Sequence, residues 1–412
     1  MLDSSDHRVL GQRLDLFHLQ EEAPGMVFWH PRGYAMYRAL ENVVREWTAS
    51  EGFEEVRTPE LLRGAIWQQS GHWDNFREHM FAFADEGKSA AIKPVNCPGH
   101  AQIVQRRSLS YRDLPLRLAE FGVVHRNEAS GVLHGLLRLR QFTQDDGHVF
   151  LAESSLESEV AKFCSSLHAF YRALGFEEVA VNFATRPAQR AGSDEVWDRA
   201  ELALERAAVR AGLACRLRPG EGAFYGPKLE FELLDRQGRA WQCGTIQLDF
   251  VLPERFELSY DAPSGERLRP VMLHRAMLGS LERFLAILLE HHAGRLPAWL
   301  APEQVRILPV HREQRGYAEE IAARLRERGL RVGVDASSET LARRVAEAHG
   351  QSVSLLWVVG AREANECTVT ERAVGDAQRV LPLVSGVEAA ARQCAPPLPE
   401  RAASTRADVF SD

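Results

Sequence analysis

The segment from Phe121 to Phe150 concentrates side chains that could perform chemistry. It contains three histidines together with a glutamate, three arginines and two adjacent aspartates: Arg126, Glu128, Arg138, Arg140, Asp145 and Asp146. The planar fork of arginine matches the oxygens of a phosphate, and a glutamate can accept a hydrogen bond from an exocyclic amine. The segment therefore predicts either a site for a phosphorylated, amine-bearing ligand or a salt-bridged hairpin at the surface.

Two strands should position these side chains. Phe121–Val124 and Leu137–Phe150 alternate apolar and polar residues, as half-buried strands do. Asn127–Gly131 (NEASG) lies between them and has the composition of a turn. The pattern predicts two antiparallel strands joined by a long loop, with Arg126 and Glu128 at the end of the first strand.

Helices and further strands flank this hairpin. The hydrophobic spacing predicts a helix over Gly33–Glu51, followed by a strand over Phe53–Arg57. Further helices are expected over Ser154–Leu174, Ser193–Gly212 and Met277–Glu290, and further strands over Glu177–Phe183 and within Phe224–Val251. Because the strands occur in runs without a regular βαβ alternation, the expected fold class is α+β, with an antiparallel sheet flanked by helices.

A smaller domain should follow a boundary at Gly294–Pro297 (GRLP). Strands and helices alternate after it, over Gln304–Pro309, Gly316–Arg328, Arg331–Val334, Thr340–His349 and Val353–Val359. The expected division is a larger domain over residues 1–297 and a compact α/β domain over residues 298–395. Residues 396–412 form a tail whose proline and serine content predicts disorder.

The composition is that of a globular protein, with 45% hydrophobic and 26% charged residues among 412. We find no apolar run of membrane-spanning length and no signal peptide in the sequence. The six cysteines form no CxxC pair, so we expect a cytoplasmic protein without a disulfide scaffold. The net charge of −7 argues against indiscriminate nucleic-acid binding, although a local basic face would still allow a specific nucleic acid to bind.

Five segments of the chain resemble threonyl-tRNA synthetases, which are class II aminoacyl-tRNA synthetases. The hairpin, with HRNE and RQFTQDDGH, is similar to their motif 2, and the other segments are KPVNCPGH (Lys93–His100), EGAFYGPKLEF (Glu221–Phe231), RAWQCGTIQLDF (Arg239–Phe250) and PVMLHRAMLGSLERF (Pro270–Phe284). The resemblance implies a catalytic domain at 1–297 and an anticodon-binding domain at 298–395. The implied reaction is the activation of L-threonine by ATP to threonyl-adenylate, followed by transfer to the 3′ end of tRNA-Thr. The helix and strand over residues 33–57 resemble motif 1 and imply a homodimer through the catalytic domain.

Cys97, His148 and His274 are candidate metal ligands. From the residues alone no local spacing links them, and each could equally be a buried cysteine or a core histidine. The resemblance implies that they bind one Zn²⁺, because they match the zinc ligands of the family. One thiolate and two imidazoles with an open position suit a substrate-binding zinc. Such a metal would bind the amino and β-hydroxyl groups of threonine and so reject valine, which an apolar pocket separates poorly from threonine.

The resemblance also assigns the substrate pocket. It implies that Arg126 binds the α-phosphate of ATP, Glu128 the adenine amine, Phe142 one face of the adenine ring, Arg283 the other face and the γ-phosphate, and Arg138 the phosphate tail. Mg²⁺ is expected with the phosphates. The implied threonine-binding residues are Gln144, Asp146, Tyr225 and Gln247, with Asp146 accepting the hydroxyl proton.

Three further residues are implied to contact tRNA. His72 matches a position near the terminal ribose and joins Arg126 and Arg283 as an expected catalytic residue, the alternative being a capping or packing histidine. Glu363 and Arg372 match anticodon-reading positions. The chain departs from the family in three places. Gln141 replaces a usual glycine, Gly350–Val358 lacks the usual proline and basic residues, and Thr368–Asp376 is much less basic than usual.

Asp6–Arg8 already matches the opening of the catalytic domain. We therefore expect the chain to lack the N-terminal domains with which bacterial members hydrolyse mischarged seryl-tRNA. A working threonine–tRNA ligase could be the housekeeping copy or an inhibitor-resistant duplicate. Two alternatives stay open: a paralogue that passes threonine to a carrier-protein thiol, and a tRNA-binding regulator with an inactive site. Intact Arg126, Glu128 and Arg283 disfavour the regulator.

Overall fold

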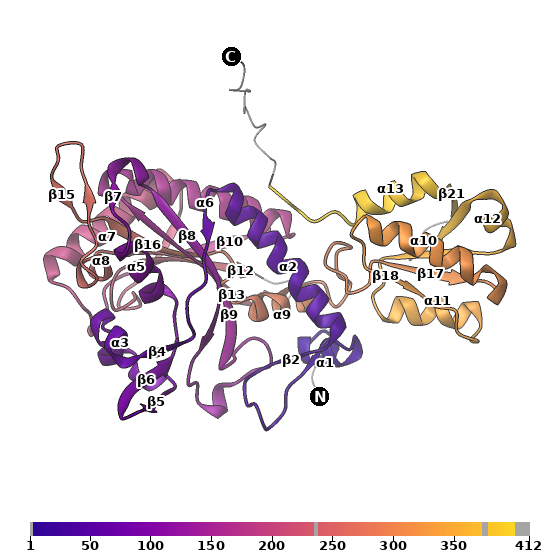
Figure 1. Cartoon of the computed structure of the whole chain (residues 1–412), viewed down its shortest axis with the longest axis horizontal. Helices are drawn as coiled ribbons and strands as arrows, with labels where there is room; N and C mark the ends of the chain where they lie inside the picture. Colours follow the sequence, from indigo (N-terminus) through magenta and orange to yellow (C-terminus); the bar gives the residue numbers. More distant parts are fainter. Residues whose placement is uncertain (1–2, 235–237, 373–377, 400–412) are drawn as a thin grey trace, which may run out of the picture. The chain divides into compact units, whose positions relative to one another are not determined.

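The computed structural model describes residues 3–234, 238–372 and 378–399 (Figure 1). It divides into two compact units, one over Val43–Phe284 and one that combines the residues up to Asn42 with Leu285–Pro397. Most of the predicted tail, residues 400–412, and residues 373–376 of the less basic segment lie outside the described residues. The predicted domain division at Pro297 stays a prediction. Within the described part of the chain, no helix is long and apolar enough to cross a bilayer.

An eight-stranded sheet forms the centre of the unit over Val43–Phe284 (Figure 1). Its strands lie in the order β11-β10-β12-β13-β16-β9-β8-β3 and pair antiparallel, except for the parallel pairs β10–β11 and β3–β8 at the two edges. The bounds are β3 Glu54–Glu55, β8 Leu116–His125, β9 Gln141–Leu151, β10 Val179–Ala184, β11 Cys215–Arg218, β12 Lys228–Leu234, β13 Ala240–Asp249 and β16 Val271–Ala276. The predicted α+β fold with an antiparallel sheet flanked by helices is confirmed.

The predicted hairpin is confirmed as β8 and β9, which pair antiparallel along their whole length. The second strand begins at Gln141, whereas the sequence pattern placed its start at Leu137. The residues in between belong to the loop, which is closed by a bridge between His134 and Arg138. Because β8 ends at His125, opposite Gln141, the residues from Leu137 to Arg140 have no strand beside them to pair with. Leu136, Leu137 and Leu139 of the loop are nevertheless buried, which explains the misleading alternation.

Helices cover this sheet, and α6 packs against α7 and against β12, where the rings of Phe163 and Phe231 lie 6.1 Å apart. The predicted helices at Gly33–Glu51, Ser154–Leu174 and Ser193–Gly212 are confirmed with small changes at their ends. The bounds are α2 Pro31–Ser50, α3 Gly64–Ser70, α4 His72–Asn75, α5 Cys97–Gln105, α6 Leu156–Ala173, α7 Asp194–Arg210, α8 Val251–Arg255 and α9 Leu281–His291.

Helix α9 begins at Leu281, and the predicted start at Met277 was wrong. The backbone N–H groups of Met277, Leu278 and Gly279 donate to the carboxylate of Asp145 on β9 at 2.7–2.9 Å. Gly279 has φ +80°, a conformation that ends any helical path there. Met277 and Leu278 are buried in this loop, so the apolar pattern runs through loop and helix alike.

Two three-stranded sheets lie beside the main sheet, in the orders β4-β6-β5 and β15-β14-β7. Their bounds are β4 Leu61–Arg63, β5 Ala82–Asp85, β6 Lys88–Ile92, β7 Leu109–Ser110, β14 Tyr260–Asp261 and β15 Arg267–Leu268. Short 3₁₀ helices occur at η1 Arg77–His79, η2 Tyr111–Asp113, η3 Ser130–Val132, η4 Glu153–Ser155 and η5 Arg312–Gln314.

The other unit contains a five-stranded sheet in the order β18-β17-β19-β20-β21. β17, β18 and β19 are parallel, and β20 and β21 continue the sheet antiparallel. Helices α10 and α13 belong to one core and α11 to another, on opposite sides of this sheet (Figure 1). The bounds are α1 His7–Arg13, β1 Phe17–His18, β2 Phe28–Trp29, β17 Val305–Pro309, α10 Arg315–Glu327, β18 Val332–Val334, α11 Leu341–Gly350, β19 Leu355–Val359, α12 Ala361–Glu366, β20 Thr368–Arg372, β21 Arg379–Pro382 and α13 Leu383–Gln393. The predicted α/β domain is confirmed, with its predicted elements within two residues of their observed ends.

Candidate active site

A cavity of about 430 Å³ lies between the β8–β9 hairpin, β12, β13 and the loop before α9. Seven of the predicted substrate-binding residues line it: Arg126, Glu128, Arg138, Phe142, Gln144, Gln247 and Arg283. The sequence did not single out the other polar residues of its wall, which are Lys228, Gln242, Cys243, Thr245 and Ser280. The structure thus brings together all five side chains predicted to bind a nucleotide.

Two half-buried arginines line this cavity. Arg126 donates from Nε to the carbonyl oxygen of Pro94 at 3.3 Å, and its guanidinium lies 5.1 Å from the centre of the Phe142 ring. Arg283 donates from Nε to the carbonyl oxygen of Leu137 at 2.9 Å. Burial lowers the pKa of both guanidinium groups. An anionic ligand would relieve that desolvation, so the arginines offer fixed positive charge where phosphate is expected.

Glu128 is engaged by two arginines of the hairpin. Its Oε2 accepts from Nη2 of Arg138 at 2.8 Å, and its backbone carbonyl accepts from Nε of Arg140 at 2.8 Å. The contact to Arg140 fixes the backbone, whereas the contact to Arg138 occupies the carboxylate. The Glu128–Arg138 pair would have to separate if each side chain bound its own part of a ligand.

A second set of polar side chains lies deeper. Asp146 accepts from Nδ2 of Asn96 at 2.9 Å, and burial raises the pKa of the Asp146 carboxyl. The hydroxyl of Tyr225 donates to Oε1 of Gln247 at 2.5 Å. Gln144 has a buried Oε1 for which the described residues provide no hydrogen-bond partner. We call Gln144, Asp146, Tyr225 and Gln247 the floor of the cavity. The floor combines an acceptor without a partner, a carboxylate and an amide.

Cys97, His148 and His274 meet beside this floor. Their ligand atoms all lie within 4.8 Å of one another, and the three residues are 3%, 1% and 5% exposed. Cys97 begins α5, while His148 on β9 is paired directly with His274 on β16. The ring of Tyr225 stacks on that of His274 with 4.7 Å between centroids, which connects the group to the cavity. The sequence could not show this proximity, because it results from the register of two strands that are distant in the chain.

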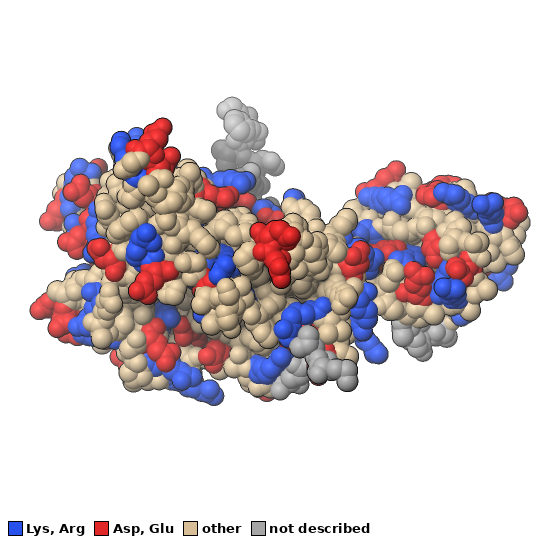
Figure 2. Space-filling view, turned by 90° about the horizontal axis from the view of Figure 1, so that it is seen from below, with Lys and Arg blue, Asp and Glu red and all other residues tan. Residues whose placement is uncertain are grey.

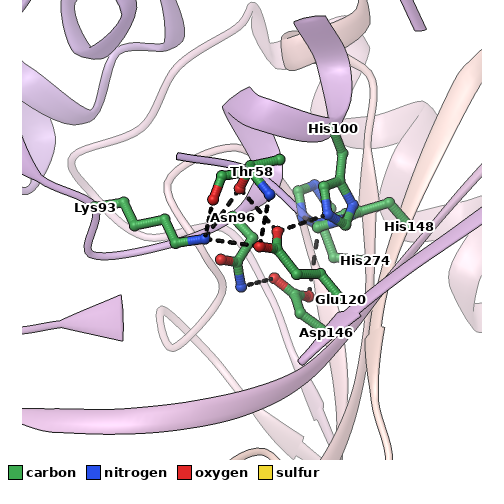
Figure 3. Close-up of polar contacts among 8 residues, drawn as sticks. All are labelled: Thr58, Lys93, Asn96, His100, Glu120, Asp146, His148 and His274. Atoms are coloured by element: carbon green, nitrogen blue, oxygen red, sulfur yellow. Dashed lines mark hydrogen bonds and ion pairs between the residues drawn. The ribbon is translucent and has the colours of Figure 1, made fainter. Parts of the chain in front are cut away.

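Hydrogen bonds fix which nitrogen of each histidine is available (Figure 3). Asp249 accepts from Nε2 of His274 at 2.9 Å, and Glu120 accepts from Nε2 of His100 at 3.1 Å, because an ionised carboxylate can only accept. His100 Nδ1 must then accept from Nδ1 of His148, at 2.8 Å. The remaining nitrogens, Nε2 of His148 and Nδ1 of His274, lie 2.9 Å apart and both present lone pairs.

Two facing lone pairs beside a cysteine sulfur fit a metal cation. Burial lowers the pKa of His148 well below its ordinary value, so a shared proton is a poor alternative. Burial, with Asp146 and Asp249 nearby, raises the pKa of the Cys97 thiol well above its usual range. A thiolate at this position therefore needs a cation beside it. Imidazole and thiolate are the ligands that zinc prefers.

His72 lies against this group. Its Nε2 is 3.9 Å from Sγ of Cys97, and its Nδ1 is 2.9 Å from Oγ of Ser70. Burial and the neighbouring His274 lower the pKa of His72 to about 3, so its ring is neutral. Both its contacts and its predicted role in the transfer step are compatible with a neutral imidazole.

The two anticodon candidates lie in the other unit. Glu363 accepts from the N–H of Gly360 at 2.9 Å and from the hydroxyl of Thr370 at 3.0 Å, so its carboxylate stabilises the start of α12. Arg372 ends β20, next to residues outside the described ranges. Their role in reading the anticodon stays a prediction.

Sequence reasoning missed a group of buried charges behind the metal candidates. Lys93 and His100 are the two ends of the segment KPVNCPGH, and Glu120 directly precedes the hairpin segment that begins at Phe121. All three are buried. A lysine followed by a glutamate 27 positions later carries no spacing signal, and only the fold makes them partners.

Comparison with known proteins agrees with this geometry. Residues 81–292 match the tRNA synthetase class II core domain (G, H, P, S and T), and residues 304–389 match an anticodon binding domain. Two curated relatives named threonine--tRNA ligase are each 52% identical: that of Nitrosomonas eutropha over 90% of this chain and 58% of its own length, and that of Gluconacetobacter diazotrophicus over 95% and 62%. The solved RNA binding domain of threonyl-tRNA synthetase from Cryptosporidium parvum is 40% identical with a TM-score of 0.92, covering 94% of this chain and 98% of that one.

A class II tRNA synthetase core with an anticodon-binding domain is thus the class that the fold and the site define. Within that class, the chain belongs to the threonyl-tRNA synthetase family. It spans about three-fifths of the length of the curated relatives it matches.

Proposed function

We propose that the chain is a threonine–tRNA ligase, which activates L-threonine with ATP and transfers it from threonyl-adenylate to the 3′ end of tRNA-Thr. One observation carries the proposal: the arginine-lined cavity and the Cys97–His148–His274 group are continuous. Gln247 lines the cavity, is bonded to Tyr225, and Tyr225 stacks on His274. A nucleotide and a metal-bound amino acid would therefore lie side by side.

ATP binding is assigned to the cavity wall. Arg126 would hold the α-phosphate and stabilise the negative charge that develops as the threonine carboxylate attacks. Phe142 would stack on adenine, with Arg283 on its other face and at the γ-phosphate, and Glu128 would accept from the adenine amine. Arg138 would leave Glu128 for the phosphate tail. Mg²⁺ is expected to accompany the phosphates.

Threonine binding is assigned to the floor. Cys97, His148 and His274 would hold one Zn²⁺, which when bound supplies a Lewis acid for the substrate's amino and hydroxyl groups. Asp146, held by Asn96, would accept the hydroxyl proton. Gln144, Tyr225 and Gln247 would complete the pocket. Valine has no hydroxyl for Asp146 or the metal, and its rejection follows because these polar groups would be left without partners.

The transfer step and tRNA binding remain proposals that rest on the family. His72 would lie near the terminal ribose, and Glu363 and Arg372 would read the anticodon. Basic and acidic side chains are interspersed on the face shown in Figure 2, which agrees with the net charge of −7 and favours tRNA contacts by a few chosen groups. A homodimer through the catalytic domain and a cytoplasmic location, the latter suggested by six free cysteines, complete the proposal.

Two assays of the purified chain test this function. Threonine-dependent exchange of pyrophosphate into ATP measures activation, and formation of threonyl-tRNA measures transfer. We expect both activities, about one zinc per chain, and no exchange with valine. Cys97→Ala should lose zinc and exchange together. Exchange without charging of tRNA would favour the carrier-protein acceptor, and zinc-free active protein would exclude the assigned metal.

A further inference from the structure

We infer that His100, Glu120 and Lys93 form an outer network that holds the metal ligand His148 in its binding tautomer. The inference rests on the proposed zinc site and assigns positioning residues to it. The network itself would not contact the substrate. It would act on the metal only through His148.

Glu120 is the centre of the outer network (Figure 3). It is 2% exposed and accepts four hydrogen bonds. Oε1 accepts from the N–H of Thr58 and from Nζ of Lys93, both at 2.9 Å. Oε2 accepts from the hydroxyl of Thr58 at 2.8 Å and from Nε2 of His100 at 3.1 Å. Every partner of this carboxylate is a donor, so Glu120 accepts in all of its contacts.

The charge of Glu120 is secured by these partners. Burial alone would raise the pKa of its carboxyl, but the hydrogen bonds from His100, Thr58 and Lys93 lower it to about 2. Lys93 is 1% exposed and supplies the compensating positive charge. An ion pair buried to this degree costs desolvation that an apolar pair would not. The position of this ion pair behind the candidate metal ligands is explained if a permanent acceptor is needed there.

Glu120 selects the tautomer of His148 through the intervening His100. With Nε2–H of His100 bonded to Glu120, Nδ1 of His100 can only accept, and His148 must place its own proton on Nδ1. Nε2 of His148 is then free to bind a metal. If His100 took the other tautomer, His148 would accept at Nδ1 and carry its proton on Nε2, facing His274. The other histidine needs no intermediary, because Asp249 fixes its tautomer directly.

Glu120→Gln tests the network with almost no change of shape. Oε1 faces the backbone N–H of Thr58 and the ammonium of Lys93, which can only donate, whereas the hydroxyl of Thr58 and Nε2 of His100 beside Oε2 can also accept. The amide nitrogen should therefore take the place of Oε2 and donate to Nε2 of His100, which reverses both tautomers. We expect zinc affinity, measured by competition with a chelator, to fall about 10- to 100-fold, the usual effect of losing a partner of a metal ligand. The visible absorption of the cobalt-substituted protein should change in the same variant.

His100 provides a second test with a rescue. His100→Ala removes the acceptor for His148 and should weaken zinc binding by a similar factor. His100→Asn places an amide oxygen where Nδ1 stood and should retain most of the affinity. His100→Leu fills a similar volume without an acceptor and should lose as much zinc affinity as His100→Ala, whereas a purely structural role would let leucine restore the affinity.

Glu159→Gln is the matched control, because it breaks another largely buried ion pair to strand β8, with Arg117. Zinc affinity should not change in this variant. An equal loss there, or unchanged affinity in both Glu120→Gln and His100→Ala, would overturn the inference while leaving the zinc site intact. If the unaltered chain binds no zinc, the proposed zinc site and this inference fail together.

Discussion

Two arginines of the cavity, Arg126 and Arg283, are each held by a backbone carbonyl from another part of the chain. Arg126, at the end of the first hairpin strand, is bonded to Pro94, and Arg283 on α9 is bonded to Leu137. These contacts use one nitrogen of each guanidinium and orient the remainder. Because both groups are already partly desolvated, a phosphate would meet them without first displacing a full hydration shell.

Replacing Arg126 by alanine should therefore slow activation strongly. We expect the rate of threonine-dependent pyrophosphate exchange to fall about 10²- to 10³-fold, the cost of removing one fixed donor from a developing oxyanion. Arg126→Lys should lose less, because it keeps the charge but not the fork. Arg107→Ala, at an exposed arginine paired with Glu54, is the control and should exchange normally. A normal rate of pyrophosphate exchange in Arg126→Ala would show that this residue takes no part in activation.

At the level of elements, the hairpin was predictable and the loop before α9 was not. Alternation revealed β8 and β9 because one side of each strand is buried. The start of α9 was hidden because Met277 and Leu278 are apolar and buried, so their contacts resemble those of a helix face. What prevents a helix is Asp145, which lies far away in sequence and takes their N–H groups. Tertiary acceptors of this kind have no local signal.

Glu282, in the first turn of α9, joins this helix to β9 and should make stability depend on pH. It accepts from the N–H of Thr143 and from the hydroxyl of Ser280, yet burial raises its pKa to about 7 from an ordinary 4.5. The folded chain then binds the proton more tightly than the unfolded chain does. The contribution of Glu282 to the free energy of unfolding should be fully present below pH 4.5 and be lost as pH rises through about 7.

Glu282→Gln removes this titration, so its stability relative to the unaltered protein should improve as pH rises from 5 to 8. Urea unfolding across that range measures the difference. Glu205→Gln, at an exposed position on α7, should show a constant difference. If the difference between Glu282→Gln and the unaltered chain does not vary with pH, Glu282 is not the buried acid described above.

At the level of the whole molecule, the family resemblance predicted more of the site than spacing could. Composition and periodicity gave the class of each unit, because core formation leaves a regular pattern. They could not join Cys97 to His148 and His274, whose proximity depends on strand register. The resemblance joined them, but it did not reveal Glu120 or Lys93, since no motif links those two positions.

The proposed activation and the proposed tRNA recognition should be separable by mutation, because their residues belong to different units. Arg372 belongs to the unit that contains Leu285–Pro397, and the arginine-lined cavity belongs to the unit over Val43–Phe284. Arg372→Ala should raise the KM for tRNA-Thr about 5- to 150-fold, corresponding to roughly 1–3 kcal/mol for a lost base contact, and leave pyrophosphate exchange unchanged. The effect should be large because a chain of net charge −7 has little general attraction for RNA to compensate.

Arg392→Ala, at an exposed arginine near the end of α13, should change neither assay. Equal losses of exchange and charging in Arg372→Ala would mean that the residue supports folding, and unchanged charging would mean that the anticodon is read by other groups.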